Sequence, residues 1–410
     1  MSQSLPGETT VPAMSTSRRE PRVLFMNQIY PPAFGGGGQY LALIRKAITR
    51  AGFESLVLAG NRGIKGQDER GVIRLPTPGG ERFPRLGAYS FALLSPLALC
   101  TRRGSFDLIH TMGKPHSVYA AILMGRLLRK PVIVASVQNR DDDPAGIVTE
   151  RFGRIKNALF SRASRFICCS GLQLETYRDA GYPSEKVRFI PNGCDPARFF
   201  PVAGEAEKLA LRARLGIPPD GFTLVTLGAI IERKGIDLLA EAWGRFRAGR
   251  RDGTLLLIGP HRSTDAGSGV VDAYVDSVRE RFARAGVAAS VQFTGKVSNV
   301  PDYLRASDAF ALMSRGEGFP VAILEAMAAG LPIVVWDLPD YRGYELQDQD
   351  HGFLLPPFDV ELLAGRLESL AGDAQLRQRM GEEARRLASR FTLERSMAEH
   401  MELYRELARP

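Results

Sequence analysis

The sequence predicts an α/β protein with two doubly wound parallel-sheet domains. Short apolar runs rich in β-branched residues alternate with amphipathic stretches, a pattern typical of parallel strands joined by helices. The alternation is interrupted once, by a proline-containing turn and loop at residues 191–201, and then starts again. A chain of 410 residues with 44% hydrophobic content is also long enough for two cores of about 200 residues each.

Each domain is expected to contain a series of strands separated by helices. In the first domain the strands are predicted at residues 23–29, 55–58, 72–75, 108–111, 132–137, 166–169 and 187–191. In the second they are predicted at residues 223–227, 254–258, 291–294, 309–313, 333–336 and 353–355. The expected domains are residues 21–195 and 202–390, preceded by a disordered extension at residues 1–20. A final helix is expected within residues 391–410, where Met397, Met401 and Tyr404 recur at helical spacing.

Residues 314–337, SRGEGFPVAILEAMAAGLPIVVWD, carry the clearest functional pattern. The strand at 309–313 is followed by a loop containing Glu317, and a helix is expected to begin at Pro320, a residue suited to the first helical turn. Ligands of open α/β sheets lie beyond the carboxyl ends of the strands, and a helix N-terminus there favours phosphate oxygens. Glu317 and Glu325 can accept hydrogen bonds from vicinal hydroxyls, one from a hexose and the other from a ribose. The pattern therefore predicts a sugar-nucleotide site, and the alternative is an ordinary amphipathic helix with Glu325 in solvent.

Two basic residues, Arg233 and Lys234, follow the strand at 223–227 and precede a helix expected to start near Gly235. They stand where a diphosphate would arrive. Their charges could stabilise a departing nucleoside diphosphate, as a divalent metal does in other enzymes. A solvated cap of the helix is the alternative interpretation.

The segment at 314–337 resembles the signature of family 4 of the retaining glycosyltransferases, in which two glutamates with seven residues between them bind the donor sugar and the ribose of a nucleotide sugar. The similarity continues in the family's order through PPAFGGGGQYLALIRKAITRAGFESLVLAG, RFICCSGLQLETYRDAGYPSEKVRFIPNGCDPARFFP and LGAIIERKGIDLLAEAW. It implies the GT-B fold, with two Rossmann-like domains facing across a cleft. The acceptor would be bound mainly by the first domain and the nucleotide sugar by the second, and the final helix would cross back onto the first domain.

The resemblance also implies roles for individual residues. The catalytic group would be Arg233, Lys234 and Glu317, and the donor-binding residues would be Gly36, Gly37, Gln138, Gly318, Phe319, Pro320, Val321 and Glu325. The two N-terminal glycines would lie on the diphosphate side of the cleft. They belong to the run 35–38, which suggests a dinucleotide fingerprint as the competing interpretation, but the run lacks the G-x-G-x-x-G spacing.

The chain departs from the family pattern at two positions. Ala229 stands where an arginine usually follows the glycine that ends the strand, so Arg233 is expected to take over its role. Gln138 stands where many relatives have a histidine near the reacting carbon, and an amide can donate to a sugar hydroxyl but cannot carry a proton charge. This agrees with the retaining mechanism attributed to the family, in which the donor's own phosphate oxygen takes the acceptor proton. His110 and His116 are the candidates on the acceptor side.

Neither a metal nor a cofactor is expected beyond the nucleotide sugar as co-substrate. Residues 141–143 are three consecutive aspartates, but they lie in the first domain, away from the nucleotide features, and are expected to contact the acceptor or water. The four cysteines show no metal-ligand spacing and are expected to be buried free thiols.

The positive charge of the chain is concentrated in its first half. Residues 1–200 contain 28 Lys and Arg against 15 Asp and Glu, whereas residues 201–410 contain 26 against 30. Such a field could attract a phosphate-bearing acceptor or an anionic membrane surface. Nucleic acid is not expected as a partner, because no basic motif interleaved with aromatic residues occurs. An apolar stretch at 89–100, flanked by Arg82, Arg85, Arg102 and Arg103, could lie on a membrane, and packing against the sheet is the alternative.

The predicted activity is that of a metal-independent, retaining hexosyltransferase. It would move a hexosyl unit from a UDP- or GDP-sugar to a glycan or lipid-linked acceptor in polysaccharide or glycoconjugate biosynthesis. The alternatives are a synthase acting on a soluble sugar or sugar phosphate and a catalytically inactive sugar-nucleotide-binding subunit. Because the sequence shows no spanning segment and no signal peptide, the protein is expected in the cytoplasm, with peripheral contact to the inner face of the membrane.

Overall fold

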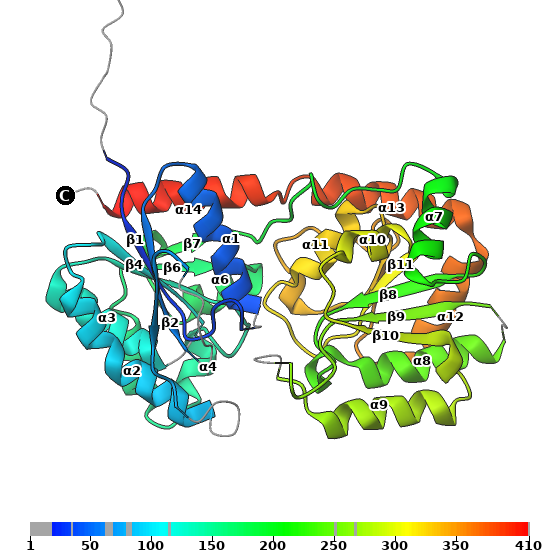
Figure 1. The fold of residues 1–410 in the computed structure, drawn as a ribbon, viewed down its shortest axis with the longest axis horizontal. Helices are drawn as coiled ribbons and strands as arrows, with labels where there is room; N and C mark the ends of the chain where they lie inside the picture. The colour runs from blue at the N-terminus through cyan, green and yellow to red at the C-terminus, as the bar shows by residue number, and fades with distance from the viewer. Residues whose placement is uncertain are drawn as a thin grey trace, which may run out of the picture.

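The computed structural model describes residues 19–33, 36–61, 69–78, 84–113, 116–249, 252–265 and 269–408. Its two halves are each built on a parallel sheet covered by helices, and they lie side by side (Figure 1). The expected α/β class with two parallel sheets is confirmed. The extension expected at residues 1–20 falls almost wholly outside the described residues.

The first sheet has seven strands in the order β3-β2-β1-β4-β5-β6-β7, all paired in parallel. The strands are β1 Val23–Met26, β2 Ser55–Gly60, β3 Val72–Leu75, β4 Leu108–Met112, β5 Val132–Ala135, β6 Arg165–Cys168 and β7 Val187–Phe189. The helices of this half are α1 Gly36–Arg50, α2 Pro84–Thr101, α3 His116–Leu128, α4 Pro144–Val148, α5 Gly153–Phe160 and α6 Gly171–Asp179.

The second sheet has six strands in the order β10-β9-β8-β11-β12-β13, again all parallel. The strands are β8 Thr223–Leu227, β9 Thr254–Ile258, β10 Val291–Gly295, β11 Ala309–Leu312, β12 Ile333–Trp336 and β13 Gly352–Leu355. The helices are α7 Glu205–Leu215, α8 Ile236–Ala248, α9 Asp272–Arg284, α10 Val300–Arg305, α11 Val321–Ala328, α12 Val360–Gly372 and α13 Ala374–Ala388.

The strands lie where they were predicted, and only their ends differ. The clearest case is β5, which ends at Ala135 although the apolar run continues to Val137. The carboxylate of Asp142 accepts hydrogen bonds from the backbone N–H groups of Val137 and Gln138, at 3.3 and 3.1 Å. These bonds turn the chain away from the sheet before the run is complete.

Alternation along each strand places side chains in the two layers that cover the first sheet. Val23 and Phe25 of β1 belong to the core beneath α1, whereas Leu24 and Met26 belong to the core beneath α2 and α3. All four side chains are buried, because the sheet has helices on both faces.

The order of strands reverses between β1 and β4 in the first sheet and between β8 and β11 in the second. At such a switch point the loops at the carboxyl ends of the two neighbouring strands run to opposite sides of the sheet and leave room for a ligand. In the second domain these loops are residues 228–235 and 313–320, which contain Lys234 and Glu317. The fold therefore brings two sequence-predicted segments to one place.

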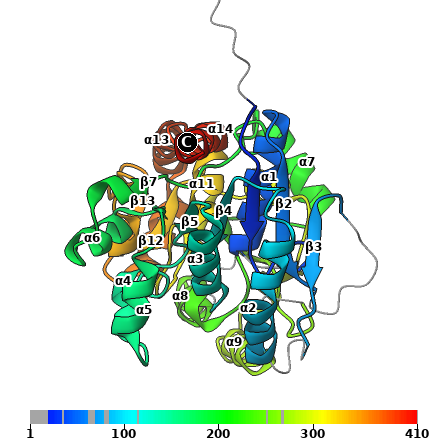
Figure 2. The same cartoon turned by 90° about the vertical axis from the view of Figure 1, so that its left-hand side faces the viewer.

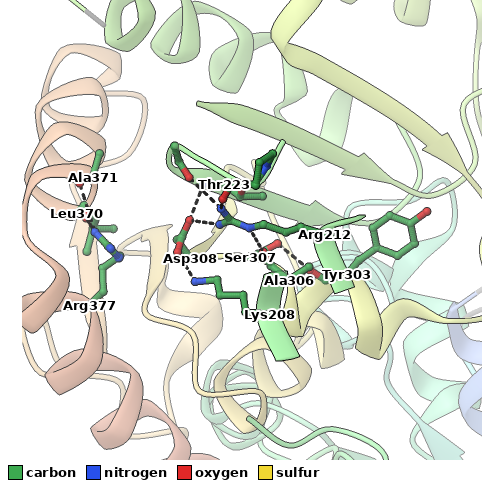
Figure 3. A network of polar contacts seen from close by, with 12 residues as sticks. Lys208, Arg212, Thr223, Tyr303, Ala306, Ser307, Asp308, Leu370, Ala371 and Arg377 are labelled. Atoms are coloured by element: carbon green, nitrogen blue, oxygen red, sulfur yellow. Dashed lines mark hydrogen bonds and ion pairs between the residues drawn. The ribbon is translucent and has the colours of Figure 1, made fainter. Parts of the chain in front are cut away.

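A buried ionic network fastens α7 to the second sheet (Figure 3). The carboxylate of Asp308 accepts from Nη2 of Arg212 and from the backbone N–H of Thr223, both at 2.7 Å, and it also pairs with Lys208. The guanidinium of Arg212 donates in addition to the carbonyl oxygen of Ala306 at 3.0 Å. Arg212 and Asp308 are buried and hydrogen-bonded, so removal of one of them would leave an uncompensated buried charge in the second domain.

The last helix, α14 Leu393–Leu407, lies over the first domain although it follows α13 of the second (Figure 1). Its buried residues Met397, Leu403 and Tyr404 belong to the core beneath α1. Just before it, Thr392 forms a parallel bridge with Cys194, at the other connection between the two halves. The two halves are thus joined by two connecting segments, which lie next to each other at Cys194 and Thr392.

Candidate functional site

The loops after β8 and β11 bring three predicted catalytic residues into contact. Nζ of Lys234 lies 2.5 Å from Oε1 of Glu317, and Nη1 of Arg233 lies 3.0 Å from its Oε2. The three residues meet because β8 and β11 are hydrogen-bonded neighbours, although they are more than 80 residues apart in the chain. The fold thus brings together the three residues that the sequence analysis assigned to the catalytic group.

Gly235 allows the two loops to approach this closely. Its φ of +64° lies in the left-handed region, and an added Cβ would stand 1.9 Å from the carbonyl oxygen of Met313. Any side chain at this position would therefore push the loop bearing Lys234 away from the loop bearing Glu317.

Glu317 is buried, and both its carboxylate and its backbone N–H form polar contacts. Oγ of Ser314 donates to its Oε1 at 2.5 Å, and its backbone N–H donates to Oδ1 of Asp340 at 2.9 Å. Burial by itself would raise the pKa of the Glu317 carboxyl, but the charges of Lys234 and Arg233 outweigh it and hold the pKa below its usual value. Glu317 is therefore an anion at neutral pH.

Lys234 is the opposite member of this pair. Burial lowers the pKa of its ammonium, and the carboxylate of Glu317 opposes that effect without cancelling it. The ammonium is held against the end of β8, where the side chain of Lys234 passes over Gly228. The position fits a cation that meets a phosphate group at the carboxyl edge of the sheet.

Glu325 stands on α11, which begins at Val321 and has Pro320 as its N-cap residue. The helix thus starts one residue later than the sequence indicated. The side chain of Glu325 is half-buried, and desolvation raises its pKa to about 7, although the charge of Arg198 acts in the opposite direction. It is therefore poised between its neutral and ionised forms near neutral pH.

Predicted donor residues from both domains converge on Val137, next to Gln138. A Cβ on Gly318 would stand 1.7 Å from the carbonyl oxygen of Val137, so only glycine permits this contact between the domains. From the other side, a Cβ on Gly37, in the first turn of α1, would stand 3.5 Å from Cγ2 of Val137. Gly36 begins the same helix and has open space around it.

Asn139 is a site residue that sequence reasoning missed. Its Nδ2 donates to Oδ1 of Asp340 at 2.9 Å and to the carbonyl oxygen of Gly318 at 3.3 Å, and its Oδ1 accepts from Oγ of Ser170 at 2.8 Å. The residue thus connects a loop of the first domain to the loop that carries Glu317. Asn139 directly follows Gln138 at the end of a buried strand, and this position could have identified it from the sequence.

The donor loop has a second anchor on its other side. Nδ2 of Asn192 donates to the carbonyl oxygen of Phe319 at 3.0 Å, and the ring of Phe319 stacks on Tyr344. The hydroxyl of Tyr344 in turn donates to the carbonyl oxygen of Cys169 at 2.5 Å. The buried ring of Phe319 therefore fixes the backbone of the donor loop by packing.

His110 does not lie where the sequence analysis expected it. It sits on β4 with no exposed surface, its Nδ1 lies 2.7 Å from the hydroxyl of Tyr404, and its ring stacks on His400. The expectation that it faces the acceptor is therefore corrected: the return of α14 covers β4 and makes His110 part of the core. His116, by contrast, is exposed at the start of α3, edge-on to the ring of Tyr89 at 4.7 Å between centroids.

Two of the three aspartates at 141–143 accept hydrogen bonds from the backbone. Asp143 caps α4 by accepting from the N–H of Gly146, and Asp142 turns the chain after β5. Both are buried, and only Asp141 is exposed. No group of three metal-ligating side chains occurs within the described ranges.

Two parallel-sheet domains with a lysine, an arginine and a glutamate gathered at the switch point of the second define a GT-B glycosyltransferase scaffold. Family models agree with this class: the model described as glycosyl transferases group 1 matches residues 207–387, and the one described as Glycosyltransferase Family 4 matches residues 34–198. The chain belongs to this glycosyltransferase family.

Individual proteins show the same relationship. A D-inositol 3-phosphate glycosyltransferase of Jonesia denitrificans is 30% identical over 225 residues, which cover 54% of this chain and 51% of that protein. A lipopolysaccharide core biosynthesis mannosyltransferase of Rhizobium meliloti is 32% identical over 190 residues, 44% of this chain and 47% of the relative. The chain thus spans about half the length of the curated relatives that it matches.

The solved structures share the fold over nearly the whole chain. The Anabaena HepE protein, in complex with UDP-glucose, superimposes with a TM-score of 0.76 at 20% identity, covering 94% of this chain and 99% of that one. At this level of identity the similarity establishes the fold.

Proposed function

We propose that the protein is a retaining hexosyltransferase that uses a nucleoside diphosphate sugar as donor. The observation that carries this proposal is the contact of Lys234 and Arg233 with Glu317 at the switch point of the second sheet. Two cations beside one buried carboxylate suit a donor with a diphosphate at one end and sugar hydroxyls at the other. The UDP-glucose bound to the structurally similar Anabaena protein supports a UDP-sugar as the first donor to test.

The main chemical task of the two cations is to stabilise the leaving group. As the bond between the anomeric carbon and the phosphate oxygen breaks, negative charge grows on the diphosphate. Lys234 and Arg233 would meet this charge while Glu317 serves as their counter-ion and as an acceptor for a sugar hydroxyl. Because these charges are supplied by side chains, no metal ion is required for this step.

The proton of the acceptor hydroxyl needs another destination in this site. Gln138 can hydrogen-bond a sugar hydroxyl but cannot take a proton. His110 is buried against α14 and cannot reach a substrate in this structure. In line with the retaining mechanism attributed to the family, a phosphate oxygen of the donor is proposed as the base, which places the acceptor on the same face of the sugar as the leaving group and retains the configuration.

Nucleotide recognition is assigned to α11. The N–H groups of Val321 and Ala322, at its start, are proposed to bind phosphate oxygens, whereas that of Ile323 donates to the carbonyl oxygen of Pro320. Glu325 is proposed to accept hydrogen bonds from the ribose. Gly36 and Gly37, at the first turn of α1, would border the diphosphate from the other domain. Gly318 and Val321 complete the donor side of the site by backbone contacts.

The acceptor is proposed to be a glycan or a lipid-linked glycan held by the first domain near His116, in polysaccharide or glycoconjugate biosynthesis. A relative that acts in lipopolysaccharide core biosynthesis supports this choice. A soluble sugar phosphate is the second candidate, and the relative that acts on D-inositol 3-phosphate favours it. Donor hydrolysis or transfer would exclude an inactive sugar-nucleotide-binding subunit. We also propose that the protein acts in the cytoplasm, where nucleotide sugars would be available as donors.

A thermal-shift screen tests the donor before any acceptor is known. UDP, GDP, ADP and their hexose conjugates are added to the full chain at matched concentrations, and one nucleotide series should raise Tm. The sugar conjugate should then be hydrolysed or transferred. Absence of a shift with every nucleoside diphosphate would contradict the proposal, because the cationic cluster would then have another purpose.

A further inference from the structure

Three neighbouring helices of the first domain expose large apolar side chains on one surface. Helix α3 lies between α2 and the pair α4 and α5 (Figure 2), and it packs against both α2 and α5. We call this surface the apolar face and define it by its exposed residues Leu86, Tyr89, Leu93, Leu97, Leu123, Leu127, Phe152 and Ile155. Leu93 is 79% exposed, and Leu127 and Ile155 are each 71% exposed.

In helix α2 the exposed apolar side chains are separate from those that pack in the core. Its inner side already buries Phe91 and Leu99, which have no exposed surface. The residues Leu93 and Leu97 form a second stripe at helical spacing on the outer side, so α2 is apolar on both sides. A helix that needs only one apolar side for packing has a second one available for a partner.

Cations surround the apolar face, and carboxylates are scarce there. Residues 84–104 and 116–130 contain no Asp or Glu, and Glu150 near α5 is paired with Lys156. Six exposed arginines lie on or beside the same helices: Arg102, Arg103, Arg126, Arg129, Arg151 and Arg154. Among the residues that the structure describes, none of these six forms a salt bridge with a carboxylate.

We propose that the apolar face docks on the surface of an anionic lipid bilayer. The leucines would enter the boundary between headgroups and acyl chains, and the arginines would meet anionic headgroups. A second copy of this chain is a poor occupant, because a two-fold dimer would bring the same unpaired arginines against one another. None of the described helices is long and apolar enough to cross a membrane, and docking does not require one.

The position of the apolar face connects it to the proposed acceptor side. Its end at Tyr89 packs edge-on against His116, which follows the carboxyl end of β4. Near the same end, a Cβ on Gly87 would lie 3.3 Å from Nε2 of Gln28, just after β1. Docking would therefore bring the switch point of the first sheet close to the bilayer. This link deepens the proposed transfer to a lipid-linked acceptor and rests on that proposed function.

The structure extends the surface well beyond the stretch at 89–100 that the sequence indicated. The outer sides of α3 and α5 add Leu123, Leu127 and Ile155, which are distant in the chain but adjacent in the fold. Of the basic residues that the sequence singled out, Arg82 and the side chain of Arg85 lie outside the described residues. The docking inference therefore rests on the arginines named above.

Vesicle sedimentation with the full chain, in the absence of nucleotide, tests the inference. Binding to phosphatidylcholine vesicles that contain about one third phosphatidylglycerol should exceed binding to pure phosphatidylcholine, and it should fall as salt rises. A triple variant with Leu93→Ser, Leu97→Ser and Leu127→Ser should lose at least about tenfold in vesicle partition. A second triple variant with Arg102→Glu, Arg103→Glu and Arg126→Glu should lose a similar amount.

Two control variants carry changes of the same kind on the second domain. The double variant Val271→Ser with Leu209→Ser is the control for the leucine variant, and Arg385→Glu is the control for the arginine variant. Both should bind vesicles as the parent does. The Tm of every variant should equal that of the parent, and the nucleotide found in the donor screen should raise it by the same amount. These two results would show that the variants are folded. Equal binding to neutral and anionic vesicles, or full binding by either triple variant, would overturn the inference. A dimer that the leucine variant abolishes, without vesicle binding by the parent, would assign the face to a second copy and would also overturn it. Vesicle binding is measured without donor, so failure of the proposed activity leaves its result intact.

Discussion

Nζ of Lys234 lies 2.5 Å from Oε1 of Glu317 across two loops of the second domain. The contact couples the residue expected at the diphosphate to the residue expected at the donor sugar. A change at Glu317 leaves Lys234 and Arg233 without their shared carboxylate, whereas a change at Lys234 leaves Glu317 with Arg233 as its remaining cation. Removal of one partner of a buried pair costs up to about 3–5 kcal/mol. Stability and catalysis at this site therefore have to be measured together.

Replacement of Lys234 tests the stabilisation of the leaving group. The variant Lys234→Ala should lower kcat about a hundredfold or more, and Arg233→Ala should cause a loss of the same kind, because each removes a charge that meets the departing diphosphate. Initial rates with the donor from the screen provide the measurement, and urea unfolding shows whether the variant is folded. Lys46→Ala, an exposed lysine on α1, is the matched control and should keep the parental rate. A fully active Lys234→Ala variant would refute the assignment.

The two glutamates should differ in the ligand that they affect. Glu325→Ala should weaken a free nucleoside diphosphate, since a ribose is present with or without the sugar. Glu317→Ala should spare the free nucleotide and weaken the sugar nucleotide, because it removes the hydroxyl acceptor and releases Lys234 and Arg233 toward the phosphates. Calorimetric titration with both ligands measures this, with Glu317→Gln as the variant of matched size. If both alanine variants lost affinity for the nucleoside diphosphate alike, the two roles would not be separate.

The raised pKa of Glu325 predicts a pH dependence of nucleotide binding. Burial raises this pKa from 4.5 to about 7, so the ligand-free protein gains stability from the neutral carboxyl at low pH and loses it as pH rises through about 7. A carboxylate accepts ribose hydrogen bonds better than a neutral carboxyl, so affinity should rise by up to about tenfold from pH 6 to pH 8.

Comparison with Glu325→Gln isolates this effect from ionisation of the nucleotide phosphate, which both proteins experience equally. The variant should show a flatter dependence of Kd on pH. The same slope of log Kd against pH in both proteins would mean that Glu325 does not titrate in the site.

Metal independence follows from cations supplied by side chains. An excess of EDTA should leave the transfer rate nearly unchanged, because Arg233 and Lys234 replace a divalent ion at the diphosphate. Initial rates with and without the chelator measure this. Loss of activity that manganese restores would overturn the prediction and would return attention to the exposed Asp141.

The network around Asp308 should be a stability element without a part in binding. Asp308→Ala leaves the buried Arg212 and the partly buried Lys208 without their carboxylate, so the free energy of unfolding should fall by about 3–5 kcal/mol. Urea denaturation provides the measurement. Asp220→Ala, at an exposed position, should change it by less than about 0.5 kcal/mol. A loss for Asp308→Ala as small as that of the control would show that the buried charges relax without cost.

Local sequence patterns were sufficient for the elements and the donor signature. The strand expected at 72–75 and the helix expected to carry Met397 and Tyr404 appear as β3 and α14. Apolar periodicity is a property of some ten neighbouring residues, and burial on a sheet or under a helix is the outcome that it encodes. Lys234 and Glu317 lie in contact because each follows a strand, and the carboxyl ends of parallel strands share one edge.

The sequence by itself determined that two parallel sheets form and that basic and acidic groups follow their strands. Only the tertiary structure decided what surrounds those groups. His110 is buried because α14 returns from the far domain, Asn139 meets Asp340 because the domains touch at Gly318, and the leucines of α2 and α3 form one surface because the helices are neighbours. The physical reason is the same in each case: a periodic pattern specifies which side of an element is apolar, whereas its partners depend on packing between segments that are far apart in the chain.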